Sequence, residues 1–555
     1  MARSLNHPTS DVDPNPRKRI FPSSRRRDAR HGERHLVLSW PVFTLAAVVV
    51  VPVAIAGIVA PKNIALLFGS AVDWAGRHFG AAYMVVATGA LLLVLGLAVS
   101  RYGNVRLGSN DSRPEHSVFS WAAMLFAAGI STDIMFFAVA EPISQYLFPP
   151  IGQGETVEAA REAVAMTVFH YGVHGWGLYA LLGMALAYFA YRRGAELSLR
   201  STLRPVLGHY ADGWIGHFAD AAALIGGMFG IATSLGVGVV QLSAGLHVIF
   251  GLSSGFSTQT ILLIVGIAVA CLSALTEISR GIKFLCTANV LLAGVLLLYV
   301  LITGRTTMLI DALVGTVGDF LRLAPQWSLE TYAWERPDAW LNAWTLFFWA
   351  WWITWAAFVG LFLARISRGR TIREFVIGTM TIPFSYVVVW VGIFGNSALD
   401  LVRAPSATGP TSVADRDPVV GKEFIDLVTK APELGLFELL ASRPLGSLAV
   451  VLAVVVGVLF YVTSADSGAL VMAELSTKPT YEGDQSEPTP WLRIFWAVMT
   501  GALTLAMLLA GGIPVLQNAT VVMALPFTLV IVMSAIGLLK ELRQNECSSE
   551  AVSSG

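Results

Sequence analysis

Residues 344–355 read WTLFFWAWWITW, a run that places five of the chain's 16 tryptophans within 12 residues. On a helix that advances about 100° per residue, one face collects most of these rings: Trp344, Phe348, Trp351 and Trp355, with Trp352 beside them. The run lies inside a long apolar stretch that ends at the basic segment 365–373. The sequence therefore predicts a membrane helix that carries a wall of aromatic rings.

Such a wall has two interpretations. A quaternary ammonium ion has no N–H to donate, so ring faces must attract it, at about 0.5–2 kcal/mol each. Tryptophans also form belts at membrane interfaces, and bulky rings pack helix bundles. Belt residues lie at helix ends, whereas this run extends about two turns inward. The spacing alone leaves both interpretations open.

The composition predicts a polytopic helical membrane protein. Mean hydropathy is +0.65, hydrophobic residues make up 55% and charged residues 13%, which is about half the charged share of soluble proteins. A formal net charge of zero argues against a nucleic-acid partner. The three cysteines are isolated and suggest neither a metal site nor a disulfide framework. No nucleophile–base pair or metal-ligand cluster indicates an enzyme or a cofactor.

Long apolar runs predict twelve transmembrane helices, each near the length of about 20 residues that a bilayer requires. The expected spans are 38–60, 81–100, 117–147, 164–191, 217–249, 258–277, 284–303, 341–366, 374–398, 445–475, 491–511 and 517–539. The third, fifth, eighth and tenth are long enough to tilt, bend or protrude.

Basic residues predict the orientation. Most of the 37 Lys and Arg residues fall in the N-terminal tail, the C-terminus and the even-numbered loops, so the positive-inside rule predicts that both termini are cytoplasmic. Residues 1–36 are expected to form a basic, disordered tail. A twelve-helix domain is expected over 37–541, with a long external loop at about 399–444 and a short cytoplasmic tail at 542–555.

Two spans carry polar groups in the middle of an apolar helix. In the third, residues 129–133 read GISTD, which predicts local unwinding and puts Asp133 near the bilayer centre. In the tenth, Thr463, Ser464 and Asp466 also interrupt an apolar run. These groups either cap helices and satisfy freed backbone groups, or contact a ligand or ion. Both alternatives stay open.

The fourth span supplies a second aromatic set. Tyr171, Trp176 and Tyr179 lie within about 140° of arc on a helix. On another flank, His170 and His174 are spaced four residues apart. Such a pair suits a metal site or a proton relay, but no acidic or cysteine ligand accompanies it in this segment.

Residues 344–352, together with 364–373, resemble the signature of the betaine/choline/carnitine transporters. The likeness covers roughly residues 38–540, including the AEP of 140–142 and the VTSADS of 462–467. It implies an all-α polytopic membrane protein with two leading helices and a five-plus-five inverted-repeat, LeuT-like core, with repeats at about 117–277 and 341–511. It also implies a homotrimer and an amphipathic linking helix at about 309–323.

In that family, rings of the fourth and eighth spans cage the trimethylammonium group. By resemblance, the substrate contacts are Tyr171, Trp176, Tyr179, Trp351, Trp352 and Trp355. Position 171 is tryptophan in several betaine and carnitine members, so the cage is altered here while staying aromatic.

Asp133 is similar to the aspartate of the family's proton-coupled bacterial choline transporters, whereas betaine members generally have glycine there. The physical chemistry agrees, because betaine brings its own carboxylate while choline brings a bare positive charge and a hydroxyl. Ser131-Thr132 departs from the glycine-rich pair that those choline transporters usually have.

The coupling ion is expected to be the proton, through Asp133, although import driven by the membrane potential alone stays open. Thr463 and Ser464 match hydroxyl positions of one sodium site of the betaine members, and Asp466 is a further ion or gating candidate. Gly227 and Ile231 stand near the positions of the second sodium site's threonines, which argues against two-sodium coupling.

The expected function is import of choline across the bacterial inner membrane, for osmoprotection by conversion to betaine. The alternative is a sodium- or proton-coupled symporter of glycine betaine or another zwitterionic osmolyte. A receptor that binds quaternary ammonium ligands without moving them is a third reading.

Overall fold

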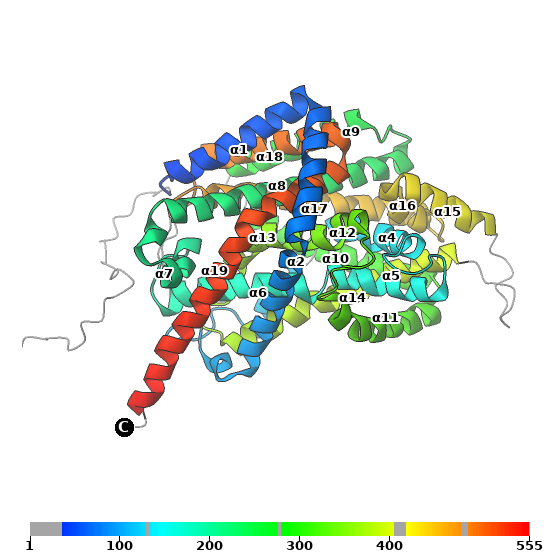
Figure 1. Ribbon diagram of the computed structural model, residues 1–555. Coiled ribbons are helices and arrows are strands. Elements are labelled where there is room, and N and C mark those ends of the chain that lie inside the picture. The colour runs from blue at the N-terminus through cyan, green and yellow to red at the C-terminus, as the bar shows by residue number, and fades with distance from the viewer. Residues whose placement is uncertain (1–35, 129–131, 276–278, 404–417, 479–486, 554–555) are drawn as a thin grey trace, which may run out of the picture.

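The computed structural model describes residues 36–128, 132–275, 279–403, 418–478 and 487–553 (Figure 1). These residues fold into helices, and the pairing between extended segments is confined there to two isolated bridges, Leu38 with Thr477 and Arg106 with Thr371. The expected all-α membrane protein is confirmed. The expected tail at 1–36 lies almost wholly outside the described residues.

The described residues form a bundle of helices. Their bounds are α1 Trp40–Val59, α2 Pro61–Val99, α3 Val118–Ala128, α4 Thr132–Leu147, α5 Val157–His170, α6 Val173–Ala187, α7 Leu199–Leu207, α8 Trp214–Phe250, α9 Phe256–Leu275, α10 Ser279–Thr303, α11 Thr306–Trp327, α12 Asp338–Ala343, α13 Thr345–Ile366, α14 Ile372–Val402, α15 Pro418–Lys430, α16 Gly435–Ala441, α17 Gly446–Leu475, α18 Pro490–Gly511 and α19 Ile513–Ser553.

Within the described residues, ten helical segments are long and apolar enough to cross a membrane. An eleventh candidate is the C-terminal part of α10 together with α11, which bend by 114° where they meet. The third expected span covers α3 and α4, which have 11 and 16 residues and lie on either side of residues 129–131, outside the described residues. Twelve spans therefore remain a prediction, while the polytopic architecture is established.

Three elements differ from the sequence-based expectations. The helix α2 has 39 residues and begins at Pro61, twenty residues before the expected span. The external loop at 399–444 contains the end of α14 and the helices α15 and α16, and α19 runs through the expected tail to Ser553. Helix α17 is continuous from Gly446 to Leu475, so the polar residues of the tenth span do not break the helix.

Helices α6, α8 and α13 form the centre of the bundle, because their apolar windows are mostly buried by protein, whereas α1 and α9 are largely exposed. Close packing of α6 on α13 depends on two glycines. A Cβ at Gly183 would lie 3.1 Å from that of Leu363, and a Cβ at Gly360 would lie 3.2 Å from the Gly183 nitrogen. Small residues allow such close approach in membranes.

The amphipathic helix expected at 309–323 is present as α11, which lies along one edge of the bundle beside α5 and α14 (Figure 1). Arg161 of α5 fixes it there through two hydrogen bonds of 2.8 Å to the Asp319 carboxylate. Asp319 is buried and Arg161 is exposed. This ion pair joins α11 to α5.

Candidate functional site

Four of the predicted aromatic residues gather where the C-terminus of α5, α6 and α13 meet. Trp352 is the central ring. The ring centroids of its three neighbours lie at 4.9 Å for Tyr179, 5.9 Å for Trp176 and 6.3 Å for Tyr171. All three neighbours are buried and Trp352 is half-buried. We call Tyr171, Trp176, Tyr179 and Trp352 the aromatic cluster.

The orientation of Trp352 is fixed from two sides. Its indole Nε1 donates to the backbone carbonyl of His170 over 2.8 Å. Its six-membered ring occupies the space that a side chain at Gly175 would need, because a Cβ there would overlap the indole. The absence of a side chain at Gly175 of α6 therefore leaves the space that the Trp352 indole of α13 occupies.

Trp351 and Trp355 point elsewhere, toward α8. Trp351 stacks on Phe347 at 5.0 Å and donates its Nε1 hydrogen to the Gly230 carbonyl at 3.2 Å. Trp355 contacts Phe358 edge-on at 5.1 Å. Among the described residues, no ring contact joins these two tryptophans to the aromatic cluster, so the six predicted rings do not form one continuous wall.

Asp133 lies in the first turn of α4 and is 4% exposed. It lies one helical turn before Phe137, whose ring centroid is 6.1 Å from that of Tyr171, so Asp133 is on the side of α4 that faces the aromatic cluster. The predicted unwinding falls on residues 129–131, which include Ser131 and lie outside the described residues.

Phe137 and Phe348 complete the surroundings and were not predicted as site residues. Their centroids lie 6.1 Å and 5.1 Å from that of Tyr171, and 5.3 Å from each other. Phe137 follows Asp133 by four residues, so both lie on one face of α4. That spacing is a sequence signal that would have identified Phe137 once Asp133 was chosen.

The two histidines of the fourth span both contact Phe169 and Trp349 but differ in their hydrogen bonds. His170 is hydrogen bonded through Nδ1 to the Glu141 carboxylate at 2.5 Å and through Nε2 to the Thr345 hydroxyl at 3.0 Å. His174 packs against Phe169 and Trp349, and neither of its ring nitrogens has a hydrogen-bond partner. Within the described residues, no group of three or more metal-ligating side chains is present.

Two polar residues of the tenth span contact the helices around them. The Thr463 hydroxyl donates to the carbonyl oxygens of Leu459 and Phe460 at 2.9 and 3.0 Å, within the uninterrupted α17. Asp466 lies 3.5 Å from the Arg493 guanidinium of α18. Arg493 was not anticipated, since nothing in the sequence indicates which basic residue reaches Asp466. Ser464 is half-buried on the same helix.

The positions related to a second sodium site are apolar. Ile231 is 2% exposed and would lie 3.1 Å from a Cβ at Gly468. Gly227 faces the Met472 side chain, whose Cε would lie 3.0 Å from a Cβ at that glycine. Neither residue offers a side-chain oxygen to a cation.

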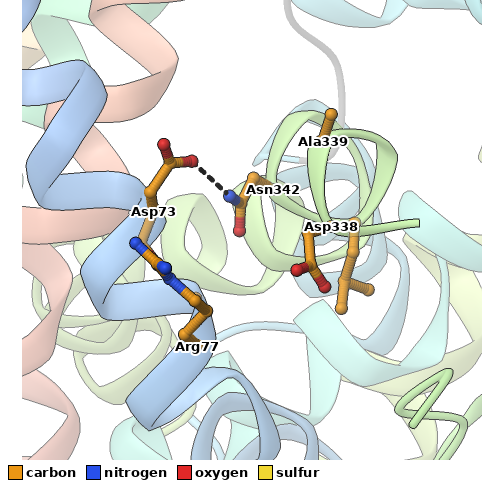
Figure 2. A pocket seen from close by; sticks show the side chains of 7 residues that line it. Asp73, Arg77, Asp338, Ala339 and Asn342 are labelled. Carbon is orange, nitrogen blue, oxygen red and sulfur yellow. Dashed lines mark hydrogen bonds between the residues drawn. The ribbon is translucent and has the colours of Figure 1, made fainter. Parts of the chain in front are cut away.

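A polar cavity of about 310 Å³ lies apart from the aromatic cluster, between α2 and α12 (Figure 2). Asp73 and Arg77 of α2 face Asp338 and Asn342 of α12 across it, and the Asn342 amide donates to Asp73 at 3.3 Å. Asp338 also pairs with Arg336 at 3.0 Å. Helix α12, which lines this cavity, immediately precedes α13 and its tryptophan run.

Comparison with known proteins gives a consistent result. Residues 41–547 match the family described as "BCCT, betaine/carnitine/choline family transporter". The chain is 46% identical over 488 residues to the high-affinity choline transport protein of Escherichia coli strain K12, covering 88% of this chain and 69% of that protein.

Two relatives come from Acinetobacter baylyi. The osmo-dependent choline transporter BetT2 is 48% identical over 472 residues, which is 85% of this chain and 66% of that protein. A glycine betaine transporter is 40% identical over 497 residues, which is 89% of this chain and 72% of that protein. The chain thus spans about two thirds of the length of these relatives.

Proposed function

The chain belongs to the betaine/carnitine/choline family of transporters, and from that premise we propose that it imports choline across the bacterial inner membrane. Members of this family are transporters, so the chain is a transporter and not an enzyme. Two relatives described as choline transporters, at 46% and 48% identity, support choline over the alternative substrate. A glycine betaine transporter at 40% identity keeps betaine as the second candidate.

The observation that carries the proposal is the buried carboxylate of Asp133 beside the aromatic cluster. Choline's trimethylammonium group suits the faces of Trp352, Trp176 and the two tyrosines. Its positive charge and its hydroxyl both suit a carboxylate. Betaine would bring a second carboxylate toward Asp133, which like-charge repulsion disfavours.

We propose that import is driven by protons or by the membrane potential. Choline's charge alone gains about 2.3 kcal/mol per 100 mV on moving inward. The apolar Gly227 and Ile231 and the internally bonded Thr463 argue against coupling to two sodium ions. Symport with protons would use Asp133. A homotrimer with cytoplasmic termini, serving osmoprotection through conversion of choline to betaine, completes the proposal.

Uptake into proteoliposomes tests the proposal directly. Labelled choline and labelled betaine are offered separately, with sodium, proton and potential gradients imposed one at a time. We expect choline uptake that needs no sodium and that increases with an inside-negative potential. Sodium-dependent betaine uptake without choline uptake would establish the alternative, and binding without uptake would indicate a receptor.

Gly175→Val is expected to lower choline affinity by more than about tenfold, because the new side chain must displace the Trp352 indole and a ring of the cluster contributes up to about 2 kcal/mol. Gly89→Ala of α2 is the control, since a Cβ at Gly89 would meet nothing within 4 Å. The measurement is choline KM in uptake at matched membrane levels. An unchanged KM in Gly175→Val would show that the position of Trp352 against Gly175 does not contribute to choline binding.

A further inference from the structure

Three buried side chains from three helices meet beneath the aromatic cluster. His170, at the end of α5, lies between Glu141 of α4 and Thr345, the first residue of α13. The distances are 2.5 Å from Nδ1 to Glu141 Oε1 and 3.0 Å from Nε2 to Thr345 Oγ1. Glu141 and His170 are 0% exposed and Thr345 is 2% exposed. We call these residues the histidine network.

His170 bridges the two side chains through its two ring nitrogens. Nδ1 is hydrogen bonded to the Glu141 carboxyl group, and Nε2 is hydrogen bonded to the Thr345 hydroxyl group. Hydrogen bonds between buried groups are costly to break, because the group that loses its partner has no water to replace it. The histidine network therefore fixes the mutual positions of α4, α5 and α13.

Each member lies close in sequence to one part of the site. Glu141 is on the same helix as Asp133, eight residues and about 12 Å further along. His170 immediately precedes Tyr171. Trp352 follows Thr345 by seven residues, about two turns along the same face of α13.

His170 also contacts the site directly. Its backbone carbonyl accepts the hydrogen bond from Trp352 Nε1 at 2.8 Å. Its imidazole stacks on Phe348, with centroids 4.8 Å apart and planes within 8°, and Phe348 in turn contacts Tyr171 at 5.1 Å. His170 thus contacts both parts of the site. Its side chain binds α4, the helix of Asp133, and its main chain binds Trp352, the central ring of the aromatic cluster.

We propose that His170 is a positioning residue that sets the separation between the aromatic cluster and Asp133, and thereby selects a compact cation that carries a hydroxyl. The inference rests on the proposed function and adds to it the residue that determines the fit. His170 does not touch the substrate in this proposal. It acts through the Glu141 and Thr345 contacts on its two sides.

The sharpest test uses Thr345, where the side-chain shape can be kept while the hydroxyl is removed. Thr345→Val is expected to weaken equilibrium choline binding to the purified full-length chain by about tenfold, the ratio that one buried hydrogen bond corresponds to. Thr345→Ser keeps the hydroxyl and is expected to bind as the unmodified protein does. His174→Phe is the control for a buried histidine without hydrogen-bond partners, and its choline affinity should not change.

A second readout needs no ligand. Near-ultraviolet circular dichroism of the unliganded protein is expected to differ between Thr345→Val and Thr345→Ser, because loss of the network reorients Trp352. That difference should disappear when Trp352→Phe is added to both variants. Equal choline affinity of the Val and Ser variants would overturn the proposal, and equal spectra would overturn the claim that the network orients Trp352.

The two hypotheses fail separately. If the unmodified protein binds betaine but not choline, the proposed substrate is wrong, while the spectra and the betaine affinity of the two Thr345 variants still test the positioning role. If the unmodified protein binds choline and Thr345→Val binds equally well, the substrate stands and the positioning role is refuted.

Discussion

Asp133→Asn is expected to raise the KM for choline by at least about 30-fold, the largest single effect we expect in this protein. The substitution keeps the shape of the side chain but removes the buried charge at the start of α4. Removing one partner of a buried charge pair costs about 2 kcal/mol or more, and about 1.4 kcal/mol is a tenfold change. The measurement is choline uptake into proteoliposomes at matched protein levels.

Asp73→Asn is the matched control, because Asp73 is an exposed aspartate that lines the cavity between α2 and α12 (Figure 2). It should leave the KM for choline unchanged. Asp133→Gly adds a selectivity test, since it should weaken choline transport far more than any betaine transport. Equal losses for the two substrates would mean that Asp133 supports the fold rather than the choice of substrate.

The sequence predicted which residues are aromatic at the site but not which way each ring points. Helical spacing puts Trp351 on the main face and Trp352 on its shoulder. In the structure it is Trp352 that enters the cluster, because α6 lies on that side and Gly175 leaves room for the indole. The position of α6 relative to α13 is tertiary information that the spacing of one helix does not contain.

The polar group of the tenth span shows the same limit. Hydroxyls, an acid and a glycine occur together there within an apolar run. Helix α17 nevertheless continues through them, because the Thr463 hydroxyl donates back to the preceding turn and Asp466 reaches Arg493. Such back-bonding satisfies a hydroxyl without unwinding a helix. The partner of Asp466 lies on another helix, and the local sequence does not indicate it.

The sequence contains a signal for the early start of α2, a helical periodicity of apolar residues, that the mean hydropathy of the segment does not reveal. Ile64, Phe68, Val72 and Ala75 are buried at helical spacing, while Asp73 and Arg77 are exposed on the other side. Charged residues lower the mean hydropathy of this segment, but they do not disturb the periodic stripe that defines an amphipathic helix. Periodicity rather than hydropathy predicts where this helix begins.

Trp352→Leu is expected to raise the KM for choline by about 30-fold. Trp352 is the ring that contacts Tyr171, Trp176 and Tyr179, so its loss removes one cation–π face and loosens three others. A desolvated face contributes about 2 kcal/mol, which corresponds to that ratio. Trp352→Phe keeps an aromatic face without the Nε1 hydrogen bond and should show an intermediate KM. Uptake measured over a range of choline concentrations gives these values.

Trp355→Leu distinguishes the observed cluster from the wider cage that the family resemblance implies. Trp355 contacts Phe358 and has no ring contact with Trp352 among the described residues, so its loss should raise the KM clearly less than loss of Trp352 does. Equal effects at both positions would mean that the substrate is held by all six predicted rings, and that α13 rotates or α8 moves when choline binds. A larger effect at Trp355 would place the ammonium group on the α8 side of the helix and would exclude the aromatic cluster as its site.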